Sequence, residues 1–339
     1  MDWFERLTGF PESDYSSTKA RLAVENGRLT SRVNGKSYRT GHLELAALSG
    51  LRNRIKTGPV RHGRPRVSLI SGDVRAMHLY PEFAGALFQV ASQFNLLEMF
   101  GPHRTPEDGV TMYQSDPTQG PACAIAAGAA TIYRNYFVEL DNRCGQTQDR
   151  QIDTLADLGS ALRDRLPSDA GQLWSMINGY AFCARPALAA IAQLLDDSAP
   201  HEIDTLRGHL RIGIHTGVEA TDAAGPLPLV SQAFCSALPV AYSDIAPKYW
   251  ERFARLILEA AYEATLWAAV LNATRGSNIV LLTSLGGGAF GNDESWIEDA
   301  LHRALQLVRG YDLDVRLVSY GQPSAAFQRI AKDFGSYDR

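Results

Sequence analysis

Asn278-Ile-Val-Leu-Leu-Thr-Ser-Leu-Gly-Gly-Gly-Ala-Phe-Gly-Asn292 carries the clearest structural signal in this chain. Its apolar, β-branched beginning is typical of a buried strand, its glycines are typical of a loop, and a helical pattern follows from about Glu294. This order lets backbone N–H groups approach a phosphate or diphosphate closely. The plain alternative is a tight turn without a ligand, but four glycines within six residues exceed what one turn needs.

The composition is that of an ordinary soluble globular protein, with 339 residues, 21% charged and 45% apolar. The formal charge of −4 argues against nucleic-acid binding. The longest apolar run, residues 122–133, is too short to span a bilayer, and the charged N-terminus does not resemble a secretory signal. Four scattered cysteines indicate reduced thiols and a cytoplasmic protein. No histidine or cysteine spacing fits a metal site, so we predict no bound metal and no cofactor.

Strands are predicted to alternate with helices from Arg66 onward. The predicted strands are 67–70, 86–91, 110–114, 210–216, 278–284 and 314–318, and the predicted helices are 122–136, 153–166, 170–195, 247–272, 295–309 and 325–334. This alternation predicts a three-layer α/β/α fold with a mixed central sheet. Residues 1–65 are expected to form an N-terminal extension packed on the core, and residues 66–339 the main domain, with a helical insertion at about 145–205. Ligands of such sheets bind beyond the carboxyl ends of the strands.

Asp73 and Val74 follow the first strand of the predicted core. A carboxylate at this place can accept a hydrogen bond from an exocyclic amine such as adenine N6, and the next residue can offer a backbone N–H. The alternative for Asp73 is a helix N-cap or a turn residue.

Three motifs in order resemble the macrodomain family: Gly-Asp-Val at 72–74, Ala-Ser-x-x-Asn at 91–95, and the late glycine loop. The resemblance implies that the chain binds ADP-ribose and that Asp73 contacts adenine. It implies that Gln93 or Asn95 lies near the distal ribose and that Phe290 lies against the sugar. The diphosphate would then be held by the loop Gly286 to Gly291, with Gly286, Gly287, Gly288, Ala289 and Gly291, and Asn292 would belong to the same ADP-ribose site.

The sequence departs from the family at the first glycine-rich loop, which Tyr113–Ile125 replaces, and it lacks the Gln-Glu-Glu signature of the poly(ADP-ribose) glycohydrolase branch. Residues 88–98 and Thr-Gln-Gly-Pro at 118–121 are instead similar to the MavL-type, arginine-specific macrodomain hydrolases. That similarity implies removal of ADP-ribose from an arginine side chain of a modified protein, with ubiquitin as a candidate.

Carboxylates suit this chemistry, because cleavage of an ADP-ribosyl bond passes through an oxocarbenium-like state. Asp116 is the first catalytic candidate, Asp108 the second and Glu98 the next acid in reach, and Gln119 could orient water or the guanidinium. The plain alternatives are a helix N-cap for Asp116, a turn for Asp108, a solvated helix end for Glu98 and surface polarity for Gln119. The excess of acids between residues 98 and 119 favours a cationic leaving group, although a solvated acidic loop explains it as well.

Two rival functions stay open at this point. The first is a non-catalytic reader of ADP-ribose that uses the same cleft. The second is a nucleotide-dependent enzyme on a Rossmann-like sheet, which is disfavoured because the glycine loop lies late in the chain and no acid ends the following strand.

Overall fold

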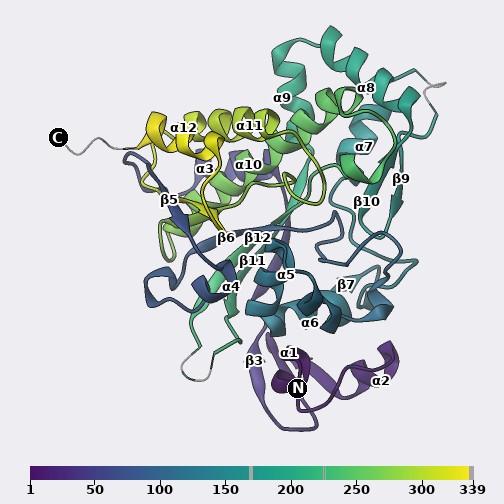
Figure 1. The fold of residues 1–339 in the computed structure, drawn as a ribbon, viewed down its shortest axis with the longest axis vertical. Helices are drawn as coiled ribbons and strands as arrows, with labels where there is room; N and C mark the ends of the chain where they lie inside the picture. The colour runs from purple at the N-terminus through teal and green to yellow at the C-terminus, as the bar shows by residue number, and fades with distance from the viewer. Residues whose placement is uncertain (168–170, 224, 226, 336–339) are drawn as a thin grey trace.

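The computed structural model describes residues 1–167, 171–223, 225 and 227–335. Its centre is a seven-stranded sheet in the order β4-β11-β12-β6-β13-β14-β5 (Figure 1). The strands are β4 (His42–Ala47), β5 (Arg66–Ser71), β6 (Leu87–Ala91), β11 (Arg211–Glu219), β12 (Leu229–Cys235), β13 (Ile279–Leu282) and β14 (Asp314–Ser319). β4, β11 and β12 pair antiparallel, and all pairs from β12 to β5 are parallel. The predicted mixed sheet is therefore confirmed.

The central parallel strands β6 and β13 are mostly buried because helices cover both of their faces. β13 is the Ile-Val-Leu-Leu run of the sequence signal, and its last three residues are buried. β6 beside it is buried at four of its five positions. Parallel strands end at the same edge of a sheet, so the segments that follow β5, β6, β13 and β14 meet there.

Helices form a layer on each face of this sheet, which confirms the predicted three-layer architecture (Figure 1). One layer holds α3 (Leu48–Thr57), α10 (Glu251–Ala273), α11 (Glu294–Leu307) and α12 (Ala325–Phe334), and the other holds α4 (Val74–Met77), α5 (Gln119–Ala126) and α6 (Gly128–Tyr136). α10 is buried over most of its circumference, as expected of a helix that is apolar all round.

The N-terminal residues form a small lobe that shares one buried apolar cluster with the main body. The lobe consists of α1 (Trp3–Thr8), α2 (Tyr15–Ala20), β1 (Leu22–Glu25), β2 (Arg28–Ser31) and β3 (Ser37–Arg39). Its cluster includes Trp3 and Phe4, and side chains of α5 and α6 complete it. β4 and α3 belong to the central sheet and its helical layer, so the main domain extends across the predicted boundary between residues 65 and 66.

The region predicted as a helical insertion contains a β-hairpin. It holds α7 (Ala156–Arg163), β9 (Trp174–Ile177), β10 (Tyr180–Cys183), α8 (Arg185–Asp197) and α9 (Pro200–Gly208). The predicted helix over 170–195 is therefore wrong in its first half, and its first residue lies outside the described residues. Asn178 and Gly179 form the hairpin turn with φ of 46° and 80°, a left-handed pair that the Asn-Gly dipeptide accommodates.

Two further predictions need correction, and one strand of the sheet was not predicted. The strand predicted at 110–114 is the 3₁₀ helix η3 (Thr111–Ser115), and η2 (Pro106–Asp108) precedes it. The helix predicted at 122–136 is two helices, α5 and α6, which break at Ala127. β12 was not predicted. The remaining short elements are η1 (Pro81–Phe83), β7 (Glu139–Leu140), β8 (Arg143–Cys144), η5 (Val240–Tyr242) and η6 (Pro247–Tyr249). None of the helices in the described ranges is long and apolar enough to cross a membrane.

Candidate functional site

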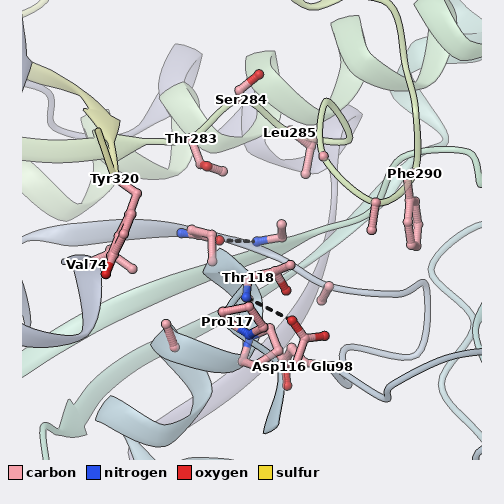
Figure 2. A pocket seen from close by; sticks show the side chains of 18 of the residues that line it. Val74, Glu98, Asp116, Pro117, Thr118, Thr283, Ser284, Leu285, Phe290 and Tyr320 are labelled. Atoms are coloured by element: carbon pink, nitrogen blue, oxygen red, sulfur yellow. Dashed lines mark hydrogen bonds between the residues drawn. The ribbon is translucent and has the colours of Figure 1, made fainter. Parts of the chain in front are cut away.

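A cleft of about 1020 Å³ lies at the carboxyl edge of the parallel strands. In Figure 2, the segment Thr283–Leu285 forms one wall and the segment Asp116–Thr118 the opposite wall. Val74 and Tyr320 lie at one end of the cleft and Phe290 at the other. Of the predicted site residues, the cleft is lined by Asp73, Val74, Gln93, Asp116, Gln119, Gly286, Gly288, Ala289 and Phe290.

The glycine loop follows β13, and two of its glycines are required by the loop itself. Gly286 and Gly291 have φ of 76° and 67°, in the left-handed region that favours glycine. A Cβ on Gly286 would lie 2.4 Å from the Cβ of Ala237, so a side chain does not fit there. Asn292 is buried, and its Nδ2 donates to the Leu238 carbonyl at 2.8 Å. Asn292 therefore anchors the loop and does not line the cleft.

The middle of this loop presents unpaired backbone donors. Gly286, Gly288, Ala289 and Phe290 all line the cleft. Among the described residues, their backbone N–H groups have no hydrogen-bond acceptor. A Cβ on Gly288 would meet nothing within 4 Å, so its Cα faces open space. Successive free N–H groups of this kind attract anions. Arg75 is the one cation among the described lining residues, and it is paired with Asp222.

Asp73 and Val74 occupy the end of the cleft that follows β5. Asp73 is the N-cap of α4, and its Oδ1 accepts from the Arg75 N–H at 2.8 Å. Val74 is the first residue of α4, where a backbone N–H has no intrahelical partner. The side chain of Tyr320 lines the same end of the cleft as Val74 and is 86% exposed (Figure 2). Tyr320 was not predicted, although an aromatic residue directly after β14 was a signal that could have found it.

Asp116 follows η3 on the opposite wall and is half-buried. Its Oδ1 accepts from the Thr118 N–H at 2.8 Å, which leaves Oδ2 available to the cleft (Figure 2). Gln119 lines the cleft nearby, but its amide is engaged by β6: its Oε1 accepts from the Ala91 N–H at 2.9 Å, and its Nε2 donates to the Gln89 carbonyl at 2.7 Å. Gln119 therefore holds the end of β6, a role that differs from the predicted orientation of water.

Glu98 lies in the floor of the cleft and is 1% exposed, so the solvated helix end considered from the sequence is wrong. The nearest charge is Arg134, whose Nη2 lies 3.5 Å from Glu98 Oε1. Among the described residues, neither carboxylate oxygen of Glu98 has a hydrogen-bond partner. Burial raises the pKa of Glu98 to about 8 and outweighs the opposing charge of Arg134.

Two predicted residues lie outside the lining of the cleft, as do Gly287, Gly291 and Asn292 of the loop. Asp108 caps η2, where its Oδ2 accepts from the Thr105 N–H at 2.8 Å. Asn95 is fully buried, and its Nδ2 donates to Gln151 at 2.8 Å. The side chain of Gln93 does line the cleft, and its Oε1 accepts from the Met99 N–H at 2.9 Å.

Three aromatic rings surround the end of the cleft near Phe290. The ring centroids of Tyr180 and Phe290 lie 5.2 Å apart, and Tyr242 lies 5.2 Å from Tyr180 and 5.7 Å from Phe290. Burial raises the pKa of Tyr180 above its ordinary value. These rings and Asp116 line the same cleft. Tyr180 was not among the predicted site residues, because it belongs to the hairpin β9–β10, where the sequence predicts a helix.

Within the described ranges, no group of three or more His, Cys, Asp or Glu side chains could hold a metal ion. The lining presents the unpaired backbone N–H groups of the glycine loop and several hydroxyl side chains, among them Thr283 and Ser284, and its acids are Asp73, Glu98 and Asp116. This set of groups suits an elongated anionic ligand with a polar ring at one end.

No protein-family model matches the sequence, and no curated protein matches it. Among solved structures, the chain is similar to poly(ADP-ribose) glycohydrolase from Thermomonospora curvata, with a TM-score of 0.45 and 13% identity over 90% of this chain and 92% of that chain. It is also similar to poly(ADP-ribose) glycohydrolase from Deinococcus radiodurans in complex with ADP-ribose, with a TM-score of 0.45 and 14% identity over 86% of this chain and 94% of that chain.

Proposed function

We propose that the cleft binds ADP-ribose, with its diphosphate on the glycine loop. The observation that carries this proposal is the set of unpaired N–H groups at Gly286, Gly288, Ala289 and Phe290 in a cleft with no unpaired lining cation among the described residues. The volume of about 1020 Å³ is at the upper end of small-molecule sites and accommodates a dinucleotide-sized ligand.

In this proposal the adenine lies at the end formed by Asp73, Val74 and Tyr320. The carboxylate of Asp73 accepts from the exocyclic amine, the Val74 N–H donates to a ring nitrogen, and the exposed ring of Tyr320 offers a stacking face. The distal ribose then reaches the other end of the cleft, near Phe290 and Asp116.

We further propose that the protein is a hydrolase that removes ADP-ribose from arginine side chains of a modified protein, with ubiquitin as the first candidate substrate. Asp116 lines the wall of the cleft near the proposed position of the distal ribose and would stabilise the cationic sugar or activate water. The rings of Tyr242 and Phe290 offer faces to a planar guanidinium, which stacks on aromatic rings, and the buried ring of Tyr180 packs against both.

The excess of acidic residues between residues 98 and 119 supports the arginine linkage less than the sequence alone indicated. Glu107 accepts from the Gln148 N–H, Asp108 caps η2, and both lie outside the cleft lining. Glu98 and Asp116 are the acids of this segment that line the cleft. Support for the arginine linkage therefore comes from Asp116 and the aromatic rings, together with the sequence resemblance.

A turnover assay on arginine-, serine- and glutamate-linked ADP-ribosyl substrates tests the proposed reaction. The expected result is release of ADP-ribose from the arginine linkage at the highest rate. Faster cleavage of the glutamate ester would overturn the arginine assignment, and binding of ADP-ribose without any release would identify a non-catalytic reader.

A further inference from the structure

The segment that carries Asp116 has little regular structure of its own. Between residues 100 and 118 it contains only the 3₁₀ helices η2 and η3, and Asp116 follows η3 directly. The position of the Asp116 carboxylate therefore depends on whatever holds η3 in place.

Glu12 of the N-terminal lobe makes that contact. Its carboxylate accepts from the Val110 N–H at 2.9 Å and from the Thr111 N–H at 2.7 Å, which are the donors at the start of η3. The hydroxyl of Tyr136 in α6 donates to the same carboxylate at 2.7 Å. Hydrogen bonds to an ionised carboxylate are about twice as strong as neutral ones, and a negative charge suits the first turn of a helix.

Gly109 makes this approach possible. A Cβ on Gly109 would lie 2.5 Å from the Glu12 carboxylate, and the residue has φ of 82°. Any other residue at this position would displace Glu12 or strain the backbone. The contact between Glu12 and η3 therefore depends on Gly109 as well as on Glu12.

η3 also connects Glu12 to the floor of the cleft. Tyr113, in the middle of η3, is fully buried, and its hydroxyl oxygen accepts from the Glu98 N–H at 3.2 Å. The Asp116 N–H donates to the Tyr113 carbonyl at 3.1 Å. A shift of η3 would therefore move both the Asp116 carboxylate and the backbone under the cleft.

We propose that Glu12 is a positioning residue, whose carboxylate fixes η3 and thereby sets the location of Asp116. The proposal gives the N-terminal lobe a part in the site although the lobe does not line the cleft. Its consequence for turnover rests on the proposed function, whereas its consequence for η3 does not.

The test compares Glu12→Gln with Glu25→Gln, a control at an exposed glutamate of the same lobe. The glutamine keeps the size of Glu12 but loses the charge and one of the two acceptor oxygens. We expect faster hydrogen exchange of the Val110 and Thr111 amides in the free protein. For turnover we expect kcat to fall by about 10- to 100-fold with KM and ADP-ribose affinity nearly unchanged, because small displacements of a reacting group have effects of this size. The Glu25→Gln variant should match the wild type in every measurement.

Unchanged exchange in Glu12→Gln would refute the anchoring of η3, and faster exchange with full kcat would refute its link to Asp116. If Glu12→Gln does not fold, Tyr136→Phe removes one donor to the carboxylate and should change exchange and kcat in the same directions by smaller factors. A wild-type protein that neither binds nor releases ADP-ribose would refute the proposed function, while the exchange measurement would still decide the role of Glu12.

Discussion

At the scale of single residues, Asp116 and Asp108 are the informative pair, because only Asp116 lines the cleft. We predict that Asp116→Asn abolishes release of ADP-ribose and spares ADP-ribose binding, since an amide keeps the shape but neither exchanges the proton nor stabilises a cation. Asp108→Asn is the matched control and should retain full activity, because Asp108 caps η2 outside the cleft lining. Single-turnover assays and calorimetry measure both quantities. An inactive Asp108→Asn beside an active Asp116→Asn would reverse the assignment.

Asp73 and Asp293 form a second matched pair. Each is a helix N-cap whose Oδ1 accepts from the N–H two residues later at 2.8 Å, but only Asp73 lines the cleft. Asp73→Ala should therefore weaken ADP-ribose binding by about 1–3 kcal/mol, because the adenine amine loses a charged acceptor. Asp293→Ala should cost only cap stability. Calorimetry on both variants checks this, and equal affinities would remove Asp73 from the site.

Glu98 predicts a pH dependence of stability. Its pKa in the folded protein is about 8, above the ordinary value of 4.5, so the folded state retains a proton that the unfolded chain releases. Its contribution to the free energy of unfolding is therefore complete below pH 4.5 and is lost as the pH rises toward 8. The neutral Glu98→Gln variant lacks this loss. Urea unfolding at pH 5.5 and 8.5 should show that the variant gains stability relative to wild type as the pH rises, and a constant difference would contradict the protonated state.

At the scale of elements, the glycine loop contains both glycines that the fold itself requires and one, Gly288, that faces the open cleft. Gly288→Val should abolish ADP-ribose binding and leave the fold intact, because its Cβ enters open space in the lining of the cleft. Gly286→Val should instead destabilise the protein, because φ is 76° and the Cβ would collide with Ala237. Calorimetry and thermal unfolding distinguish the two effects. Normal binding by a folded Gly288→Val protein would show that the loop is only a turn.

Elements with a strong local pattern were predictable from the sequence. A β-branched run predicts β13, four glycines predict the loop after it, and an amphipathic repeat predicts α11. Each of these patterns acts within a few residues. The predicted helix over 170–195 overlooks the hairpin β9–β10, although the Asn178-Gly179 dipeptide is a strong signal for a hairpin turn. η3 was taken for a strand because the contacts that fix it come from Glu12, about 100 residues earlier in the chain.

At the scale of the whole molecule, the site could be predicted only in part, because its two ends are assembled from distant segments. Asp73 and the glycine loop could be placed at the cleft because each follows a strand with a clear local pattern, and Asp116 because it stands in a proline- and glycine-bounded turn before a helix. Tyr180 and Tyr320 reach the cleft through the hairpin and the last strand, and the burial of Glu98 depends on the first turn of α5 above it. Such contacts are set by tertiary packing, which a local pattern does not encode.

The claim that the cleft binds ADP-ribose through both of its ends is tested most directly by calorimetric titration of the wild-type protein with ADP-ribose and with AMP. We predict one site per chain for ADP-ribose. AMP lacks the second phosphate and the distal ribose, so it should bind at least about tenfold more weakly, a difference of roughly 1.4 kcal/mol. No binding of ADP-ribose, or equal affinity for AMP, would contradict the placement of the diphosphate on the glycine loop.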